Sequence, residues 1–491
     1  MTKIDDCTLV LFGASGNLSR VKLIPSLFRL DFLGRLPEKM KILSVGRSEV
    51  EESTWRDDIK SMLDIKFGKN YDAKVFDRFI ARNFYHANPP YDHNAFKRLR
   101  DKLSNASIFP QNLAFFLSVR PSDFASIVDL LASVSLTEES KTWRRVVIEK
   151  PFGTNLETAQ ALQKSITKHL KETQIYRIDH YLGKSALQNI LLMRFANHIF
   201  DPLWTHEHID HIQITNNETL GVGERTQFYD ATGALRDMIQ SHLIQMLALT
   251  TMEMPQTLSP ENIRAEKIKV LESIIPIPFD KIKKHAFRAQ YGRGKINGEE
   301  VKGYLEELGN PNSVVETYAA LKFYINTPRW KGVPIYVRTA KRLHTSDTAI
   351  AIKFKKAPLS LLEHTDNWLI ISIQPKEFTR FEIQTKIPGL DTKVRTVAMD
   401  APNRISVDES VDAYESLLLN LMQGDQSLYL HINEVEASWR LLDPVIKTWN
   451  ADKSPVFIYA AGSADPTESK VIFDKPEQFW RQSIEIGENK L

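Results

Sequence analysis

The sequence predicts an N-terminal α/β domain over residues 1–178 and a larger α+β domain over residues 179–491, with a mainly antiparallel sheet and helices. Three observations support this prediction. The chain has 491 residues, more than one ordinary hydrophobic core organises. Apolar strand-like runs alternate with helical patterns through the first half. In the second half this alternation fades, and strand-like segments follow one another.

The composition is that of a globular protein and favours no macromolecular partner. Hydrophobic residues make up 42% of the chain and charged residues 25%. The net charge of +3 gives no reason to expect nucleic acid. The single cysteine, Cys7, excludes an intramolecular disulfide and a cysteine-rich metal site. Because neither a secretory signal nor a run of about 18 apolar residues is present, we expect a cytoplasmic protein outside the membrane.

The first strand-like run ends in a glycine-rich turn. Thr8–Phe12 is apolar and β-branched, Gly13-Ala14-Ser15-Gly16-Asn17-Leu18 follows, and a helical pattern begins at once. This layout is typical of a dinucleotide-binding crossover and predicts a Rossmann-like domain. Gly13 permits the turn, and Gly16 lets the backbone approach a pyrophosphate at the helix N-terminus. The spacing departs from G-x-G-x-x-G, so an ordinary strand-to-helix turn remains an alternative.

The second strand, Lys41–Gly46, is followed by Arg47. Domains that bind NAD usually carry Asp or Glu at the end of this strand, where it accepts the ribose 2′-hydroxyl. An arginine there suits a 2′-phosphate instead. We therefore expect NADP as the cofactor, with an ordinary surface arginine as the alternative.

Two later strands complete the first half. Leu113–Val119 and Arg145–Ile148 are apolar, with a helical pattern over Ala125–Ser135 between them. The second strand stops just before Lys150. Ligands of open parallel sheets bind beyond the carboxyl ends of the strands, so Lys150 is placed to reach cofactor and substrate. The alternative is a lysine that only marks the strand end.

The segment Arg177–Lys184 carries a dense set of chemical groups. A guanidinium, a carboxylate, an imidazole, a phenol and an ammonium occur within eight residues, before a helical pattern over Ser185–Met193. The free N–H groups of a helix N-terminus favour an anion, phosphate above all, and His180 and Lys184 add positive charge. Asp179 cannot bind phosphate, so we expect it to orient a basic side chain. A charged surface loop is the alternative.

A helix predicted over Ala231–Thr250 places His242 in the middle of its apolar stripe. A histidine at a core position is either structural or a catalytic base. Asp237 lies five residues earlier, on another side of an α-helix, so the periodicity does not explain how both would face one ligand.

The rest of the second half predicts strands, helices and one exposed loop. The loop spans Glu299–Asn312, and Arg338–Arg342 forms a basic cluster at a strand end, for which a solvated face is the alternative. We expect Val435–Asn450 to be a helix kinked or split at Pro444. A further helix is expected over Asp412–Gln423. The predicted strands are Ile209–Thr215, Val315–Tyr324, Pro334–Arg338, Ile350–Lys355 and Asn367–Gln374.

Taken together, these motifs resemble the glucose-6-phosphate dehydrogenase family over essentially the full chain. The segment at Arg177 is the most specific, and the others occur in the family's order. The matching segments are Gly13–Leu18, Glu149-Lys150-Pro151-Phe152-Gly153, Arg177–Lys184, Arg236-Asp237-Met238-Ile239-Gln240-Ser241-His242-Leu243, Asp412-Ala413-Tyr414-Glu415 and Gly424-Asp425-Gln426.

The resemblance implies hydride transfer from C1 of glucose 6-phosphate to NADP, giving 6-phosphogluconolactone at the start of the pentose phosphate pathway. A hydride leaves C1 readily only as the C1 hydroxyl loses its proton, which requires a base. By resemblance that base is His242, with Asp179 holding its ring. Lys150 would lie between nicotinamide and sugar and hydrogen-bond the C1 oxygen.

The resemblance also implies binding residues for substrate and cofactor. The 6-phosphate would contact His180, Tyr181 and Lys184. Sugar hydroxyls would face Glu218, Asp237, Lys341 and Gln374. The cofactor-binding residues would be Gly13, Ala14, Ser15, Gly16, Asn17, Leu18, Arg47 and Lys150.

Several positions depart from the family pattern. Asn17 stands where the family usually has aspartate, Ala340 replaces a glycine, and Ser346 lies where relatives often have a basic phosphate ligand. The resemblance further implies a homodimer or homotetramer that needs no metal. Two rival functions remain: a dehydrogenase of another phosphorylated sugar, and a non-catalytic regulator that binds NADP or a sugar phosphate.

Overall fold

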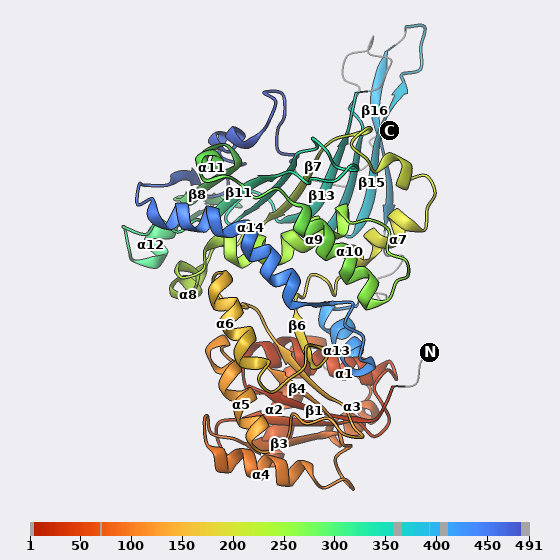
Figure 1. The fold of residues 1–491 in the computed structure, drawn as a ribbon, viewed down its shortest axis with the longest axis vertical. Coiled ribbons are helices and arrows are strands. Elements are labelled where there is room, and N and C mark those ends of the chain that lie inside the picture. Colours follow the sequence, from red (N-terminus) through yellow and green to blue (C-terminus); the bar gives the residue numbers. More distant parts are fainter. Residues whose placement is uncertain (1–3, 69–70, 357–365, 392, 403–410, 483–491) are drawn as a thin grey trace. The chain divides into compact units, whose positions relative to one another are not determined.

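The computed structural model describes residues 4–68, 71–356, 366–391, 393–402 and 411–482, and the chain folds into two compact units (Figure 1). Unit one comprises Met1–Lys184, Thr257–Arg264 and Val411–Val435. Unit two comprises Ser185–Gln256, Ala265–Ser410 and Glu436–Leu491. Each unit contains its own large sheet, and the two are described separately.

The described part of unit one contains a seven-stranded sheet in the order β17-β6-β5-β4-β1-β2-β3. All neighbouring pairs are parallel except β17 with β6. The order 3-2-1-4-5-6 is that of a doubly wound dinucleotide-binding domain, which confirms the predicted fold class for this part. The strands are β1 (Cys7–Phe12), β2 (Lys41–Gly46), β3 (Asn83–Ala87), β4 (Asn112–Leu117), β5 (Arg144–Ile148), β6 (Ile175–Ile178) and β17 (Tyr429–Leu430).

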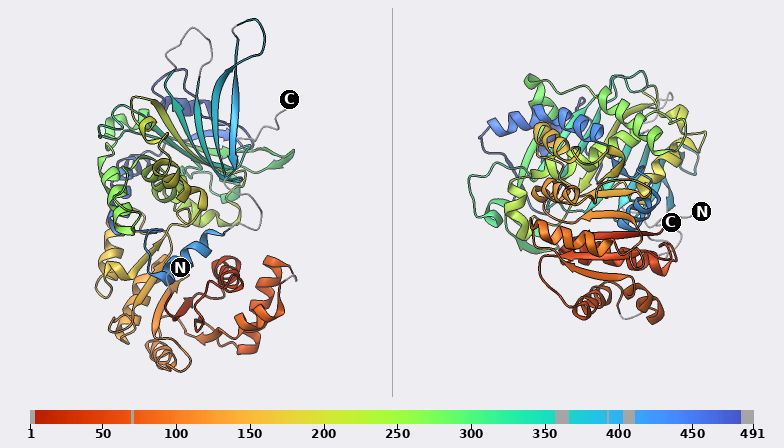
Figure 2. Two further views of the ribbon diagram at one scale, coloured as in Figure 1. Left: turned by 90° about the vertical axis from the view of Figure 1, so that its right-hand side faces the viewer. Right: turned by 60° about the horizontal axis from the view of Figure 1, so that its bottom comes forward.

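Right-handed crossovers place the helices of unit one on both faces of this sheet. Helices before β3 pack on one face and helices after it on the other (Figure 2). They are η1 (Ser19–Leu23), α1 (Ile24–Phe32), α2 (Glu52–Phe67), α3 (Ala73–Ile80), α4 (His93–Leu103), η2 (Pro121–Asp123), α5 (Phe124–Ser133), α6 (Leu156–Ile166) and η3 (Glu172–Gln174).

A segment from far along the chain completes unit one. Helix α13 (Ala413–Gln423) packs on α1, and its apolar residues join the core that α1 and α2 form with β1. Strand β17 follows it and pairs with β6 at the sheet edge. Arg177 of β6 is buried and donates to Glu172 Oε2 at 2.9 Å and to the Leu430 carbonyl at 3.3 Å. These contacts fix the strand that leads into the Arg177–Lys184 segment.

Unit two contains a nine-stranded sheet among its described residues, in the order β16-β15-β14-β13-β7-β12-β11-β8-β18. It is antiparallel except for the pairs β7–β12 and β8–β18, which confirms the mainly antiparallel class. Its strands are β7 (Ile209–Asn217), β8 (Ala286–Gly292), β11 (Tyr318–Phe323), β12 (Ile335–Ala340), β13 (Asp347–Phe354), β14 (Trp368–Gln374), β15 (Phe378–Lys386), β16 (Val394–Pro402) and β18 (Phe457–Ala460).

Helices and a small hairpin complete unit two. The hairpin pairs β9 (Gly294–Ile296) with β10 (Glu299–Val301). Helices α10 (Pro260–Ser273) and α14 (Ile432–Ala451) contain residues of both units. The other helices are α7 (Ser185–Phe195), η4 (Asp201–Leu203), η5 (Gly223–Arg225), α8 (Thr226–Asp230), η6 (Leu235–Leu243), α9 (Ile244–Thr251), η7 (Phe279–Lys281), α11 (Ile282–His285), α12 (Tyr304–Leu308) and η9 (Thr467–Ile472).

Two sequence expectations need correction, and one alternative is excluded for Arg338. The predicted loop Glu299–Asn312 contains β10 and α12, because Tyr304 is fully buried and donates to Asp230 Oδ1 at 2.8 Å. Helix α14 runs without a break through Pro444 and is not split. Arg338 is not on a solvated face: it is fully buried and forms an ion pair with Asp465.

A search of the described residues found no helix that is both long and apolar enough to cross a membrane.

Candidate active site

The glycine turn after β1 packs tightly against two neighbouring strands. Gly13 has φ +74°, and a Cβ at this position would lie 2.1 Å from the Ser118 carbonyl oxygen, so only glycine fits. Its N–H donates to the Val45 carbonyl at 3.0 Å, and Gly16 N–H donates back to Gly13 at 2.9 Å. The helical residues that follow have N–H groups without intrahelical partners, which suits an anion.

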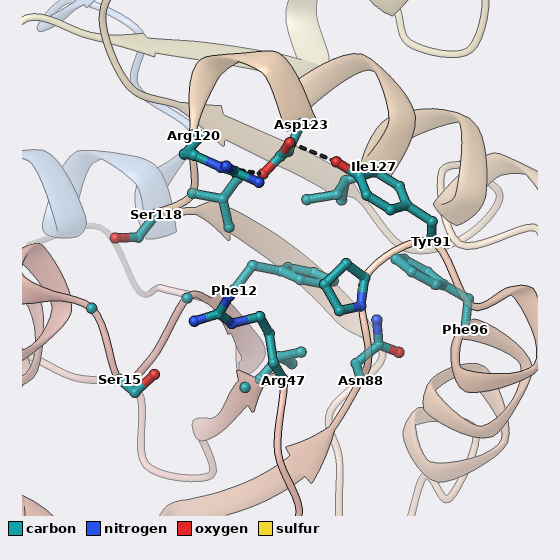
Figure 3. A pocket seen from close by; sticks show the side chains of 16 residues that line it. Phe12, Ser15, Arg47, Asn88, Tyr91, Phe96, Ser118, Arg120, Asp123 and Ile127 are labelled. Carbon is teal, nitrogen blue, oxygen red and sulfur yellow. Dashed lines mark hydrogen bonds and ion pairs between the residues drawn. The ribbon is translucent and has the colours of Figure 1, made fainter. Parts of the chain in front are cut away.

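A cavity of about 370 Å³ opens beside this turn in unit one (Figure 3). It lies at the carboxyl ends of β1, β2 and β4, where open α/β sheets bind their ligands. Phe12, Val45, Phe96 and Ile127 give it apolar walls. The glycine turn forms part of the lining, so the cavity combines apolar walls with backbone N–H groups, as a nucleotide site does.

Arg47 lines this cavity directly after β2, as the sequence placed it. Its side chain is exposed and forms no ion pair within the described part of the chain. Arg47 therefore keeps its full charge for an anionic ligand.

Lys150 and its neighbour Glu149 follow β5 at the carboxyl end of the same sheet. The Tyr414 hydroxyl, at the start of α13, donates to Glu149 Oε1 at 3.1 Å. Burial raises the pKa of Glu149 to about 7, although Tyr414 and Lys150 oppose the shift. No role was predicted for Glu149 or Tyr414, and their only signal in the sequence is that each belongs to a matching motif.

The segment after β6 folds into successive turns before α7, which begins at Ser185 as predicted. Asp179 is buried, and its Oδ1 accepts a hydrogen bond from Tyr181 N at 2.9 Å. Lys184 Nζ lies 3.7 Å from the centre of the Tyr181 ring, and the His180 ring packs edge-on against Tyr181 at 5.0 Å. The three side chains proposed to bind phosphate therefore lie together, because His180 and Lys184 both contact the ring of Tyr181.

A close backbone contact fixes this segment in unit one. A Cβ on Gly183 would lie 2.5 Å from the Ala413 carbonyl oxygen, so the loop can approach α13 only with glycine at this position. The contact connects the segment to the Asp412–Glu415 motif, where Asp412 pairs with Lys22 at 2.8 Å.

In unit two, the helix that carries Asp237 and His242 differs from the prediction. Leu235–Leu243 is a π-helix, and regular α-helix begins only at Ile244. Backbone hydrogen bonds of a π-helix join residues five apart, so Asp237 and His242 lie on the same side. His242 is fully buried, and Asp237 is partly exposed. The π-helix thus explains how Asp237 and His242 can lie on one side of the helix, which an α-helical period does not allow.

The remaining predicted sugar-binding residues lie at strand ends of unit two. Lys341, after β12, forms an ion pair with Glu218, after β7, and its Nζ lies 5.5 Å from the centre of the Tyr229 ring. Nearby carboxylates, Asp237 and Glu218 among them, add to burial in raising the pKa of Tyr229. Lys341 therefore links Glu218 to the neighbourhood of Tyr229, a residue for which no role was predicted.

Gln374 and Ser346 complete the account of the predicted positions. Gln374 is exposed at the end of β14, and its Oε1 accepts from Thr348 Oγ1 at 3.4 Å. Ser346 Oγ accepts from Thr219 N at 2.8 Å, so this departure from the family pattern stabilises a loop. Asp179 and His242 belong to different units, and their pairing stays a prediction.

Comparisons with known proteins cover nearly the whole chain. The model "Glucose-6-phosphate dehydrogenase, NAD binding domain" matches residues 10–189, and "Glucose-6-phosphate dehydrogenase, C-terminal domain" matches residues 191–481. Glucose-6-phosphate 1-dehydrogenase of Chlamydia pneumoniae is 40% identical over 97% of this chain and 96% of its own length. Glucose-6-phosphate 1-dehydrogenase of Treponema pallidum is 41% identical over 93% of this chain and 92% of its own length.

Solved structures agree with these relatives. A glucose-6-phosphate dehydrogenase in complex with its substrate glucose 6-phosphate superposes with a TM-score of 0.89 and 31% identity, covering 98% of this chain and 100% of that one. The Mycobacterium avium glucose-6-phosphate 1-dehydrogenase gives a TM-score of 0.83 and 29% identity, covering 98% and 99%. The chain therefore belongs to the glucose-6-phosphate dehydrogenase family.

Proposed function

We propose that this chain is an NADP-dependent glucose-6-phosphate dehydrogenase, which oxidises C1 of glucose 6-phosphate and releases 6-phosphogluconolactone. One observation carries this proposal: the two family models match residues 10–189 and 191–481, so both halves that the reaction needs are present. The curated relatives and the substrate complex carry the same activity in their names.

The cavity of unit one suits the adenosine end of NADP. Arg47, at the end of β2, has no ion-pair partner among the described residues, so its guanidinium suits a 2′-phosphate, and the glycine turn exposes N–H groups to a pyrophosphate. When bound, the nicotinamide accepts the hydride that leaves C1. Lys150, beyond β5, would hydrogen-bond the C1 oxygen and hold the sugar in line for that transfer.

His242 would serve as the general base and take the C1 hydroxyl proton on a ring nitrogen. His242 is fully buried in the last turn of η6, and this burial excludes water from the ring. Asp179 would accept a hydrogen bond from the other ring nitrogen, orient the imidazole and stabilise its protonated form. In support, Asp179 is itself buried and fixed by the turn that starts at Tyr181 N.

Two sets of residues would bind the two ends of the substrate. His180, Tyr181 and Lys184 would bind the 6-phosphate, because they cluster around one ring before the N-terminus of α7. Glu218, Asp237, Lys341 and Gln374 would bind the sugar hydroxyls. Phosphate binding remote from C1 then positions C1 for the reaction.

The domain division, assembly and location are proposed with the activity. Residues 1–178 would form the dinucleotide-binding domain, since they contain β1–β6, and residues 179–491 the substrate-binding and oligomerisation domain. We expect a homodimer or homotetramer, no metal requirement and a cytoplasmic location.

The direct test is an absorbance assay of the purified full chain with glucose 6-phosphate and either NADP or NAD. We expect reduced nicotinamide to form with NADP. A kcat/KM for galactose 6-phosphate equal to that for glucose 6-phosphate would support the rival sugar substrate. Binding of NADP and glucose 6-phosphate without any turnover would instead support a non-catalytic regulator.

A further inference from the structure

The cavity of unit one is lined by a second arginine that the family resemblance does not assign. Arg120 follows β4, whereas Arg47 follows β2, and β1 lies between these two strands in the sheet. The two guanidinium groups therefore flank the carboxyl end of β1 from opposite sides (Figure 3). Any ligand that extends from the glycine turn into the cavity passes between them.

Asp123 holds Arg120 in place. Its Oδ2 accepts a hydrogen bond from Arg120 Nε at 3.4 Å, and its Oδ1 accepts from the Tyr91 hydroxyl at 2.7 Å and from Ser122 Oγ at 3.1 Å. Partial burial acts to raise the pKa of Asp123, but these hydrogen bonds and the charge of Arg120 outweigh it and lower the pKa. The carboxylate is therefore ionised at neutral pH and ties the β3–α4 loop to the turn η2.

This pairing changes what Arg120 offers to a ligand. A guanidinium beside a carboxylate attracts a phosphate less than an unpaired guanidinium does, because the carboxylate repels the phosphate. Its planar face stays accessible, because the side chain is 81% exposed. Arg47 has no such carboxylate among the residues that the structure describes and retains its charge. The two arginines are therefore chemically different.

The surrounding wall suits a flat heterocycle. The lining that contains Arg120 also includes the apolar side chains of Val119, Ile127, Phe12 and Phe96. These groups offer no charge to a phosphate, whereas an aromatic base buries its faces favourably among them. Guanidinium planes stack on nucleic-acid bases in the same way that aromatic rings do.

We propose that Arg120 is a specificity residue for the adenine ring: its guanidinium, paired with Asp123, stacks on one face of the base, while Arg47 binds the 2′-phosphate. This inference rests on the proposed function, because it takes the cavity to be the adenosine end of the cofactor site. It predicts that Arg120 contributes equally to the binding affinity for NADP and for NAD, whereas Arg47 contributes only to the affinity for NADP.

The test is to measure Kd of the purified full chain for NADP and for NAD by isothermal titration calorimetry. We expect Arg120→Ala to raise both Kd values by a similar factor, about 3- to 10-fold. Arg120→Lys should behave like Arg120→Ala, because lysine keeps the charge and loses the planar face. Arg100→Ala removes an exposed arginine that pairs with Asp101 outside the cavity, and serves as the matched control.

Two results would overturn the inference alone. A selective loss of NADP affinity in Arg120→Ala, restored by Arg120→Lys, would make Arg120 a second phosphate ligand. If Arg120→Ala leaves both Kd values unchanged while the wild-type chain binds and turns over normally, Arg120 does not contact the cofactor. Failure of the wild-type chain to bind either dinucleotide would overturn both the inference and the proposed function.

Discussion

Glu149→Gln should change how the stability of the protein depends on pH. The pKa of Glu149 is about 7 in the folded chain against an ordinary 4.5, because burial disfavours the carboxylate. Between these values the folded state holds a proton that the unfolded state releases. The contribution of Glu149 to the stability of the folded chain is therefore fully present below pH 4.5, and it is lost as the pH rises through 7. A shift of this size corresponds to about 3 kcal/mol at pH 8 and above.

Glutamine keeps an oxygen that accepts from the Tyr414 hydroxyl, and it cannot ionise. The variant should therefore have nearly wild-type stability at pH 5 and exceed the wild type increasingly towards pH 8.5. For a domain of this size we expect the difference in Tm to grow by roughly 5–10 °C, measured by scanning calorimetry across the pH range. Glu157→Gln removes a glutamate from an exposed position of α6 and controls for net charge.

A difference in Tm that stays constant between pH 5 and 8.5 would refute the reasoning. Such a result would mean that Glu149 is already ionised at pH 5 in the folded chain. The Tyr414 hydrogen bond and the neighbouring Lys150 would then outweigh the cost of burial, contrary to the balance that the structure indicates.

Three further variants test the candidate site. His242→Asn should abolish NADPH production while the Kd for glucose 6-phosphate stays near wild type; turnover like that of the wild type would remove the base assignment. Arg47→Ala should raise the Kd for NADP by about 10- to 100-fold through loss of a charge-assisted contact, and equal losses for NAD would show that it does not bind the 2′-phosphate. Gly13→Ala should destabilise the chain by more than about 2 kcal/mol, because the turn needs φ +74° and the Cβ would overlap the Ser118 carbonyl; an unchanged Tm in calorimetry would contradict this.

The strands of unit one were predictable because parallel strands buried on both faces appear as continuous apolar runs. Thr8–Phe12 and Lys41–Gly46 correspond to β1 and β2 within one residue. Strand β16 was not predicted, because most of its residues are exposed and its sequence carries little alternation. The pairing of β17 with β6 also could not be predicted, because this pairing joins residues about 250 positions apart.

Candidate site residues were predicted where one short segment carries several chemical groups. Arg177–Lys184 is such a segment, and its turns place His180 and Lys184 against the ring of Tyr181. The Glu149–Tyr414 contact was missed, because its partners lie 265 residues apart and neither is unusual in its own neighbourhood. Arg120 was missed for a similar reason: its role depends on Asp123 and Tyr91, and Tyr91 comes from another loop.

Helix η6 shows why a functional site defeats a periodic pattern. In an α-helix, residues five apart point about 140° away from each other, so Asp237 and His242 could not face one ligand. In the π-helix of Leu235–Leu243 they lie on the same side. The apolar stripe of the segment fits either helix, so the sequence pattern alone does not distinguish them. π-Helices are rare and occur often at functional sites. The π geometry thus places a buried imidazole and a partly exposed carboxylate on the same side of one helix, as the proposed roles of His242 and Asp237 require.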